Sequence, residues 1–284
     1  DFSRPYKIIQ IPDTCCWTEG PPNLAMLYRQ RTRWARGLFQ TLSIHHKMIF
    51  KKTYKHKRLS NPTYKIEGYL ISSNKPEVSK VAMLNNQLKA KNANYDWSNL
   101  SDTNLVDQLK TKTSTSLDNV IGLITQPDAK VAATIVAGVS PEDLNFSAGT
   151  LRADSQMGSD NYVLAAHHVP KSDWALFSGM FYYGDIVQYI YITDLNKVYQ
   201  YKITETRFVS PSDTYIAQKD RYKENVDGIV PGKPMITTIT CDSTGAKRFI
   251  EFGTLTNTWD IKDKKIPSEA ITGFKKAANF NWSR

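Results

Sequence analysis

Between residues 120 and 252 the sequence is a series of short runs rich in β-branched and aromatic residues, and Pro, Gly, Asn and Asp punctuate the runs. Such runs favour strands, and the residues between them favour turns. A tight hairpin turn is predicted at 194–197, where two runs meet. Seven or more short strands with few helices predict a closed barrel or a sandwich of two sheets. The predicted strands are 120–125, 131–137, 162–166, 186–193, 198–209, 235–240 and 248–252.

Basic residues are concentrated at the N-terminal end of the chain. Residues 1–60 contain twelve Lys or Arg and three Asp or Glu, whereas the other 224 residues contain 25 and 24. This asymmetry predicts different surroundings or different origins for the two parts. The balanced charge of the larger part argues against a nucleic-acid-binding domain. No run approaches the eighteen or more apolar residues of a membrane-spanning helix.

Three residue types that suit acyl transfer stand at the ends of predicted strands. His167 and His168 directly follow one strand, Cys241 follows another, and Arg248 begins the next. A thiolate is a nucleophile, an imidazole transfers protons, and a guanidinium stabilises an oxyanion. If these strands are neighbours, the side chains meet at one rim. Taken one at a time, a strand-end Cys is more often a core residue, and the His pair and the Arg are more often surface polar residues.

Several strings of residues, in order along the chain, resemble class A sortases. NYVLAAHH at 161–168 resembles their histidine strand, TTITCD at 237–242 their TLxTC signature, and KRFI at 247–250 their arginine segment. Segments 120–122, 148–150, 176–178, 191–194 and 198–202 also resemble their counterparts, in the right order. The resemblance runs from about residue 61 to the last strand. The Leu of the signature is Thr238 here, and a buried hydroxyl lowers stability unless it is hydrogen-bonded.

This resemblance implies a mostly-β chain, folded as an eight-stranded sortase-type β-barrel with short helices. It implies a cysteine transpeptidase that cleaves an LPxTG-type sorting signal between Thr and Gly. By position, Cys241 would be the nucleophile that holds the thioacyl intermediate, and His167 the general acid and then the base. Arg248 would position the substrate and stabilise the oxyanion. The acceptor would be an amine of the peptidoglycan precursor, lipid II.

The resemblance also implies residues that bind the substrate. Ala165 and Ile239 would line an apolar groove for the Leu-Pro of the signal, and Thr240 would assist. His168 either orients the site or only packs, and the sequence leaves both alternatives open.

No cofactor is required by this chemistry. Some class A members bind calcium through acidic residues near the groove, and Glu142 and Asp143 are the candidates here. The implied partners are LPxTG-bearing surface proteins, the lipid II amine and the membrane surface. The implied location is the extracellular face of a Gram-positive cell membrane.

The N-terminal piece has a different resemblance. CWTEGP at 16–21 and the QxxRW pattern of Gln30, Arg33 and Trp34 resemble the C-terminal part of a processive family 2 glycosyltransferase. The expected organisation is therefore a glycosyltransferase-like fragment at 1–55, a polar tether at 56–94 and a transpeptidase domain at 95–284. The fragment contains a predicted basic helix, 23–50, in place of the usual signal anchor. One expectation is that this helix lies on a membrane surface in place of the anchor. Alternatively, the fragment results from a chimeric gene or from an error in gene prediction or assembly.

Three alternative functions are consistent with these patterns. The first is a cysteine peptidase that releases the acyl group to water. The second is a membrane-surface glycosyltransferase remnant, in which the C-terminal domain is passive. The third is an inactive module that binds LPxTG peptides without cleaving them.

Overall fold

The computed structural model describes residues 75–97, 119–169, 172–184, 188–224, 228–242 and 245–282. The chain divides into two units, Asp1–Asn61 and Pro62–Arg284, and the described residues all belong to the second unit. The predicted glycosyltransferase-like fragment at 1–55 and its basic helix at 23–50 lie outside the described residues. The predicted domain limits remain predictions.

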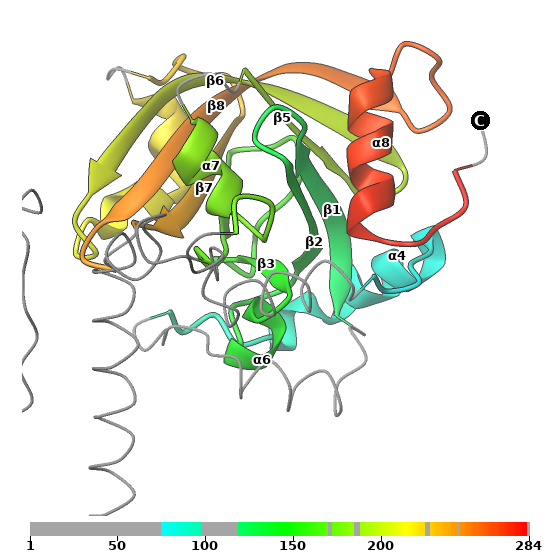
Figure 1. Cartoon of the computed structure of the whole chain (residues 1–284), viewed down its shortest axis with the longest axis horizontal. Helices are drawn as coiled ribbons and strands as arrows, with labels where there is room; N and C mark the ends of the chain where they lie inside the picture. Colours follow the sequence, from blue (N-terminus) through cyan, green and yellow to red (C-terminus); the bar gives the residue numbers. More distant parts are fainter. Residues whose placement is uncertain are drawn as a thin grey trace, which may run out of the picture. The chain divides into compact units, whose positions relative to one another are not determined.

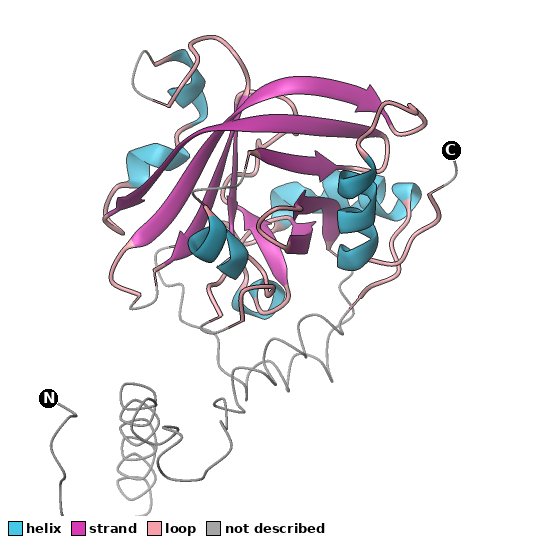
Figure 2. Ribbon diagram, turned by 45° about the horizontal axis from the view of Figure 1, so that its top comes forward, coloured by secondary structure: helices cyan, strands magenta, loops and turns pink. Residues whose placement is uncertain are grey.

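Eight strands close into a barrel in the order β1-β2-β3-β4-β7-β8-β6-β5 (Figures 1 and 2). The predicted eight-stranded barrel is thus confirmed, and the sandwich alternative is excluded. Closure removes the unpaired sheet edges that an open sheet would expose. The strands are β1 (Val120–Gln126), β2 (Val131–Val136), β3 (Ser147–Thr150), β4 (Asn161–Ala165), β5 (Tyr189–Thr193), β6 (Lys197–Val209), β7 (Met235–Cys241) and β8 (Arg248–Asp260).

Two of the eight neighbouring strand pairs are parallel, β2 with β3 and β4 with β7, and the other six are antiparallel. The hairpin turn between β5 and β6 is confirmed, because the Asp194 carboxylate accepts hydrogen bonds from the backbone N–H groups of Asn196 and Lys197. Strand β8 extends to Asp260, beyond the predicted end at 252, because β6 pairs with it along its whole length. The parallel pair has a direct consequence for function, since β4 and β7 end at the same rim of the barrel.

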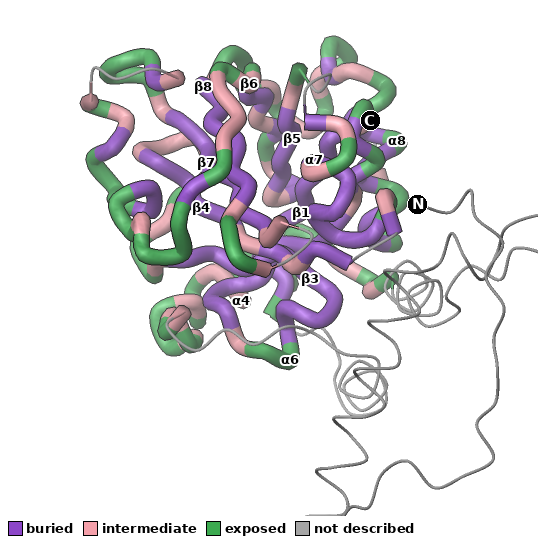
Figure 3. Tube along the Cα trace, turned by 60° about the vertical axis from the view of Figure 1, so that its left-hand side comes forward, coloured by how far each residue is buried: buried purple, intermediate pink, exposed green. Residues whose placement is uncertain are grey.

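The barrel has an inner and an outer core. One buried cluster takes residues from all eight strands, and its large members include Tyr162, Leu164 and Tyr201. A cluster shared by every strand of a closed barrel fills its interior. A second cluster lies outside β7 and β8 and includes Ile239 and Ile250. Figure 3 shows the resulting pattern, with the strands largely buried and the loops exposed.

Helix α8 (Ser268–Ala277) covers the outer face of β1 and β2 and lies beside β1 in Figure 1. Its Phe274 is fully buried in a third cluster. Gly273 permits the close approach, since a Cβ there would lie 2.0 Å from Oγ1 of Thr125 on β1. The remaining short helical elements are α4 (Lys80–Lys89), η2 (Ala90–Asn92), α6 (Pro141–Leu144), α7 (Ser178–Tyr183), η3 (Thr214–Ala217) and η4 (Lys219–Lys223). Of the helices in the described residues, none is long and apolar enough to cross a membrane.

Helix α4 belongs to the segment predicted as a polar tether, and it packs on β1. Met83 is buried, and the side-chain amides of Asn86 and Gln87 donate hydrogen bonds of 2.9 and 3.2 Å to the carbonyl oxygens of Val120 and Ile121. Polar side chains thus help to attach this helix to the barrel, while its apolar Val81, Leu84 and Leu88 are exposed.

Candidate active site

The parallel register of β4 and β7 brings His167 and Cys241 to the same level of the barrel rim. Ala165 pairs with Ile239, so two residues further on His167 follows opposite Cys241. The pairing continues past the end of β4, because the Ala166 N–H donates to the Ile239 carbonyl oxygen at 3.1 Å. The Thr240 hydroxyl adds a hydrogen bond of 2.9 Å to the carbonyl oxygen of Ala166.

The antiparallel register of β7 and β8 brings in the arginine. Cys241 is the direct partner of Arg248, the first residue of β8. Successive side chains of a strand alternate between its faces, so Cys241 and Arg248 share the outer face with Ile239 and Ile250. The Arg248 guanidinium is oriented by the loop that precedes it, since Nη1 donates to the Gly245 carbonyl oxygen at 3.0 Å.

A cavity of about 410 Å³ opens at this rim, which is within the size range of ligand-binding pockets. All three predicted catalytic residues line it, and each is half-buried, as a residue that must both be held and meet a substrate should be. Three of the four predicted substrate-binding residues, Ala165, Ile239 and Thr240, line it too. The rest of the lining is Tyr95, Asp96, Trp97, Leu144, Leu151, Ala166, Ser210, Pro211, Asp213, Thr214, Ile216 and Ala217.

His168, the fourth predicted substrate-binding residue, is not brought to the cavity. Its ring packs against Phe181 and Tyr182 of α7, with centroid distances of 4.9 and 5.5 Å. Neither ring nitrogen has a hydrogen-bond partner among the described residues. Burial lowers the pKa of His168 to about 4, although the Asp242 carboxylate opposes this shift. The ring is therefore neutral at pH 7, and the geometry favours the packing alternative.

Thr238, the departure from the signature, has a buried hydrogen-bond partner. Its hydroxyl donates to the Glu251 carboxyl on β8 at 2.9 Å, and the Gln126 amide donates to the same oxygen at 2.5 Å. All three residues are buried, and their strand positions direct them into the barrel, on the face opposite Cys241. Burial raises the pKa of Glu251 to about 7, against the lowering effect of the hydrogen bonds from Thr238 and Gln126.

The calcium candidates lie at α6. Asp143 is buried, its backbone N–H donates a hydrogen bond of 3.2 Å to the Ser140 hydroxyl, and its carboxylate accepts one of 2.7 Å from that hydroxyl. Glu142 lies in the first turn of the same short helix. In the described part of the chain, no three His, Cys, Asp or Glu residues are grouped so that they could hold a metal ion.

Sequence reasoning missed one wall of the cavity. Thr214, Ile216 and Ala217 of η3 lie in the long connection between β6 and β7 and come to the rim only through the fold. A signal was present, since the string YIA at 215–217 is a short apolar run within a polar segment.

A closed barrel with Cys, His and Arg around one rim cavity defines a class of protein, a cysteine-dependent acyl-transfer enzyme. The family model described as "Sortase domain" matches residues 124–256. Sortase A of Streptococcus agalactiae is 31% identical over 195 residues, which cover 66% of this chain and 74% of the relative. Sortase A of Listeria monocytogenes is 29% identical over 185 residues, which cover 63% of this chain and 78% of that relative. The crystal structure of the Listeria enzyme aligns with 54% of this chain and 97% of its own, at 28% identity and a TM-score of 0.44.

The chain belongs to the sortase family. It is a sortase-type cysteine transpeptidase, an enzyme that anchors proteins to the cell wall. The glycosyltransferase-like fragment predicted at 1–55 gains no support from these comparisons, whose family model matches a segment within the barrel.

Proposed function

We propose that this enzyme is a class A sortase that cleaves an LPxTG-type signal between Thr and Gly and transfers the acyl group to a lipid II amine. The observation that carries the proposal is the register of β4, β7 and β8, which places His167, Cys241 and Arg248 around one cavity. The similarity to two enzymes named sortase A supports the class.

In the first half-reaction, Cys241 begins as a thiolate and His167 as an imidazolium, and the thiolate sulfur attacks the carbonyl carbon of the signal's Thr. The Arg248 guanidinium donates hydrogen bonds to the oxyanion that develops on the carbonyl oxygen. His167 gives a proton to the Gly nitrogen as the carbon–nitrogen bond breaks, so a neutral amine leaves and a thioester remains on Cys241.

In the second half-reaction, the amine of the acceptor attacks the thioester carbon. His167, now neutral, takes a proton from that nitrogen, and the Cys241 thiolate leaves as the new amide forms. The enzyme returns to its first state. One amide bond has been broken and one has been formed, so no external energy source is needed. Both proton transfers and the oxyanion contact use side chains of this chain, so no cofactor is required.

The cavity supplies an apolar wall for the signal. Ala165 and Ile239 are neighbours across the β4–β7 pair, and both line the cavity on the same side as Cys241. They would contact the Leu-Pro of the signal. Thr240 supports them by joining the end of β7 to Ala166.

The proposed partners are LPxTG-bearing surface proteins and the lipid II precursor. These partners meet outside the cell, so the proposed location is the outer face of a Gram-positive membrane. A calcium ion is a separate proposal, in which Glu142 and Asp143 would supply ligands and the Asp143 carboxylate would give up the hydrogen bond that it accepts from the Ser140 hydroxyl.

The deciding experiment is mass spectrometry of the protein incubated with an LPETG-type peptide, with and without triglycine, beside a Cys241→Ala control. The expected result is cleavage between Thr and Gly, a ligated product with triglycine, and an acyl adduct on Cys241 that the control lacks. Product released only to water, whether or not triglycine is present, would indicate a peptidase. Peptide that binds without cleavage would indicate a binding module. Parallel samples with EDTA and with added calcium separate the two cofactor proposals: equal rates support an enzyme that needs no cofactor, and a rate that rises with calcium supports a calcium site.

A further inference from the structure

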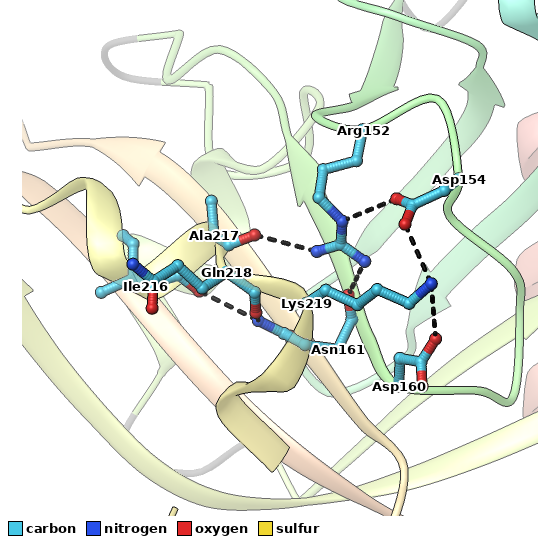
Figure 4. Close-up of polar contacts among 8 residues, drawn as sticks. All are labelled: Arg152, Asp154, Asp160, Asn161, Ile216, Ala217, Gln218 and Lys219. Atoms are coloured by element: carbon cyan, nitrogen blue, oxygen red, sulfur yellow. Dashed lines mark hydrogen bonds and ion pairs between the residues drawn. The ribbon is translucent and has the colours of Figure 1, made fainter. Parts of the chain in front are cut away.

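The cavity wall formed by η3 is held by side-chain hydrogen bonds to its backbone. Ile216 and Ala217 line the cavity and are buried. The last carbonyl groups of a helical turn have no partner within the turn and need another donor. Here the carbonyl oxygens of Ile216, Ala217 and the following Gln218 all accept hydrogen bonds from two side chains, Arg152 and Asn161 (Figure 4).

Arg152 lies in the segment between β3 and β4, and it uses its guanidinium in three directions. Nη1 donates to the Ala217 carbonyl oxygen at 2.8 Å, and Nη2 donates to the Asn161 carbonyl oxygen at 2.8 Å. Nε donates to the Asp154 carboxylate at 3.0 Å. Because each of the three guanidinium nitrogens donates a hydrogen bond, the planar group has little freedom to rotate. It therefore fixes the distance between the η3 wall and β4.

Asn161 is the first residue of β4 and is fully buried. Its amide nitrogen donates to the carbonyl oxygens of Ile216 and Gln218, each at 3.0 Å. Its side-chain oxygen accepts a hydrogen bond of 2.7 Å from the hydroxyl of Thr237 on β7. The wall is thereby joined to both of the strands whose far ends carry His167 and Cys241.

Ion pairs between Lys219 and two aspartates lie next to the hydrogen bonds of Arg152 and Asn161. The Lys219 ammonium lies 2.9 Å from the Asp154 carboxylate and 3.5 Å from that of Asp160. The hydrogen bond that the Lys219 ammonium donates to Asp154 raises the pKa of Lys219. These groups are partly exposed, so screening by water keeps their contribution small beside that of the buried Asn161.

We propose that Arg152 and Asn161 are positioning residues for the peptide substrate of this sortase. They hold the η3 wall at a set distance from the strands that carry the nucleophile and the acid, so that the cavity keeps the width in which the peptide binds. This inference rests on the proposed function. A wall already held in its binding position needs no ordering when the peptide binds, which is why its anchorage matters for affinity.

The test compares steady-state kinetics on an LPETG-type peptide for wild type, Arg152→Ala and Arg152→Lys. Loss of a hydrogen bond from a charged group predicts a rise in KM of about tenfold for Arg152→Ala. We expect kcat to change less than about threefold, since the wall contacts the peptide and not the reacting atoms. Arg152→Lys keeps the positive charge beside Asp154 but loses the planar set of N–H donors. Its KM should therefore lie between those of the wild type and Arg152→Ala.

Two controls separate positioning from folding. Lys223→Gln removes an exposed ion pair of 3.0 Å with Asp220 in the adjoining η4. Neither residue lines the cavity, so KM should stay at the wild-type value. The rate of Cys241 alkylation by iodoacetamide does not use the peptide wall, and it should be equal in all variants. Thermal melting reports the folded fraction at the assay temperature.

The outcomes are distinct. A raised KM in both Arg152 variants with an unchanged alkylation rate supports the proposal. An unchanged KM in an active enzyme overturns it and leaves the proposed function intact. A parallel fall in kcat, alkylation rate and folded fraction also overturns it, because the residue is then only structural. A wild-type protein that does not cleave the peptide overturns the proposed function, and the substrate role of Arg152 with it.

Discussion

The two faces of the β7–β8 pair carry polar groups under opposite conditions. On the outer face, Cys241 and Arg248 are half-buried and line a cavity open to water. On the inner face, Thr238 and Glu251 are fully buried beside Gln126. Charge can form on the first face because water and substrate reach it, whereas burial favours the neutral carboxyl on the second. Polar residues three positions apart on one strand therefore serve catalysis on one face and core packing on the other.

The largest expected effect comes from removing the outer nucleophile. Cys241→Ala should lower transpeptidation of an LPETG-type peptide by at least about 10⁴-fold, because no thioester can form. Its half-buried position predicts a change of less than about 1 kcal/mol in the free energy of unfolding. Peptide ligation and urea unfolding on the same preparations would measure both. Retained ligation would remove Cys241 from the mechanism.

The next effect concerns Arg248. Arg248→Lys keeps the positive charge but loses the planar set of donors, and kcat should fall about 10²–10³-fold, as for loss of an oxyanion donor. Single-turnover kinetics of acyl-enzyme formation would locate the loss in the first chemical step. A loss confined to KM would instead assign Arg248 to peptide binding.

The inner face predicts an effect on stability rather than on chemistry. The pKa of Glu251 is raised by burial to about 7, while an unfolded chain ionises its Glu near 4.3. Between these values the folded state binds the extra proton, so this carboxyl makes stability fall as pH rises from about 4.3 to 7. Glu251→Gln should remove that fall, which is on the order of 3–4 kcal/mol. Urea unfolding at several pH values would show it, and equal pH slopes for wild type and variant would contradict the buried acid.

His168 should show the opposite pH dependence. Its folded pKa of about 4 lies below the value near 6.5 of an unfolded chain, so its contribution to stability is present above 6.5 and is lost as pH falls toward 4. In the wild type the two buried groups therefore partly cancel. In His168→Phe, the free energy of unfolding should still fall as pH rises, because Glu251 is intact. In Glu251→Gln, it should rise with pH, because His168 is intact.

The same variant gives the smallest expected effect on activity, and it compares the two neighbouring histidines. Because His168 packs on α7 and does not line the cavity, His168→Phe should change kcat/KM less than about threefold. His167→Phe should lose most activity, because proton transfer is worth about 10²–10⁴-fold. A large loss in the His168 variant would restore its predicted role in orienting the site.

Sequence patterns predicted most of the barrel strands but not all of its parts. Strand β3 has the sequence SAGT, whose small residues give no strand signal, and it forms because it fits between β2 and β4. A Cβ on its Gly149 would lie 2.3 Å from the Gly138 carbonyl oxygen, so the fold selects a residue without β propensity. Helix α8 was also missed, although its buried face covers two strands.

The candidate site divides in the same way. Cys241, His167 and Arg248 were predicted because each stands at the end of a recognisable strand within an ordered set of family strings. The η3 wall and its anchors, Arg152 and Asn161, were not predicted. Their partners are backbone carbonyl groups 55 to 65 residues away, and no local pattern encodes such a contact.

The sequence by itself determined the strand runs, the family resemblance and the residue types available for chemistry. These depend on alternation, turn residues and motif order, which are local properties of the chain. Only the tertiary structure decided which polar residues meet at the cavity and which are enclosed in the barrel. Thr238 and Cys241 lie three positions apart, yet the register of β7 between β4 and β8 directs one inward and the other to the substrate. The physical reason is that a residue's surroundings depend on the strands paired beside it, and closure of the barrel sets that pairing.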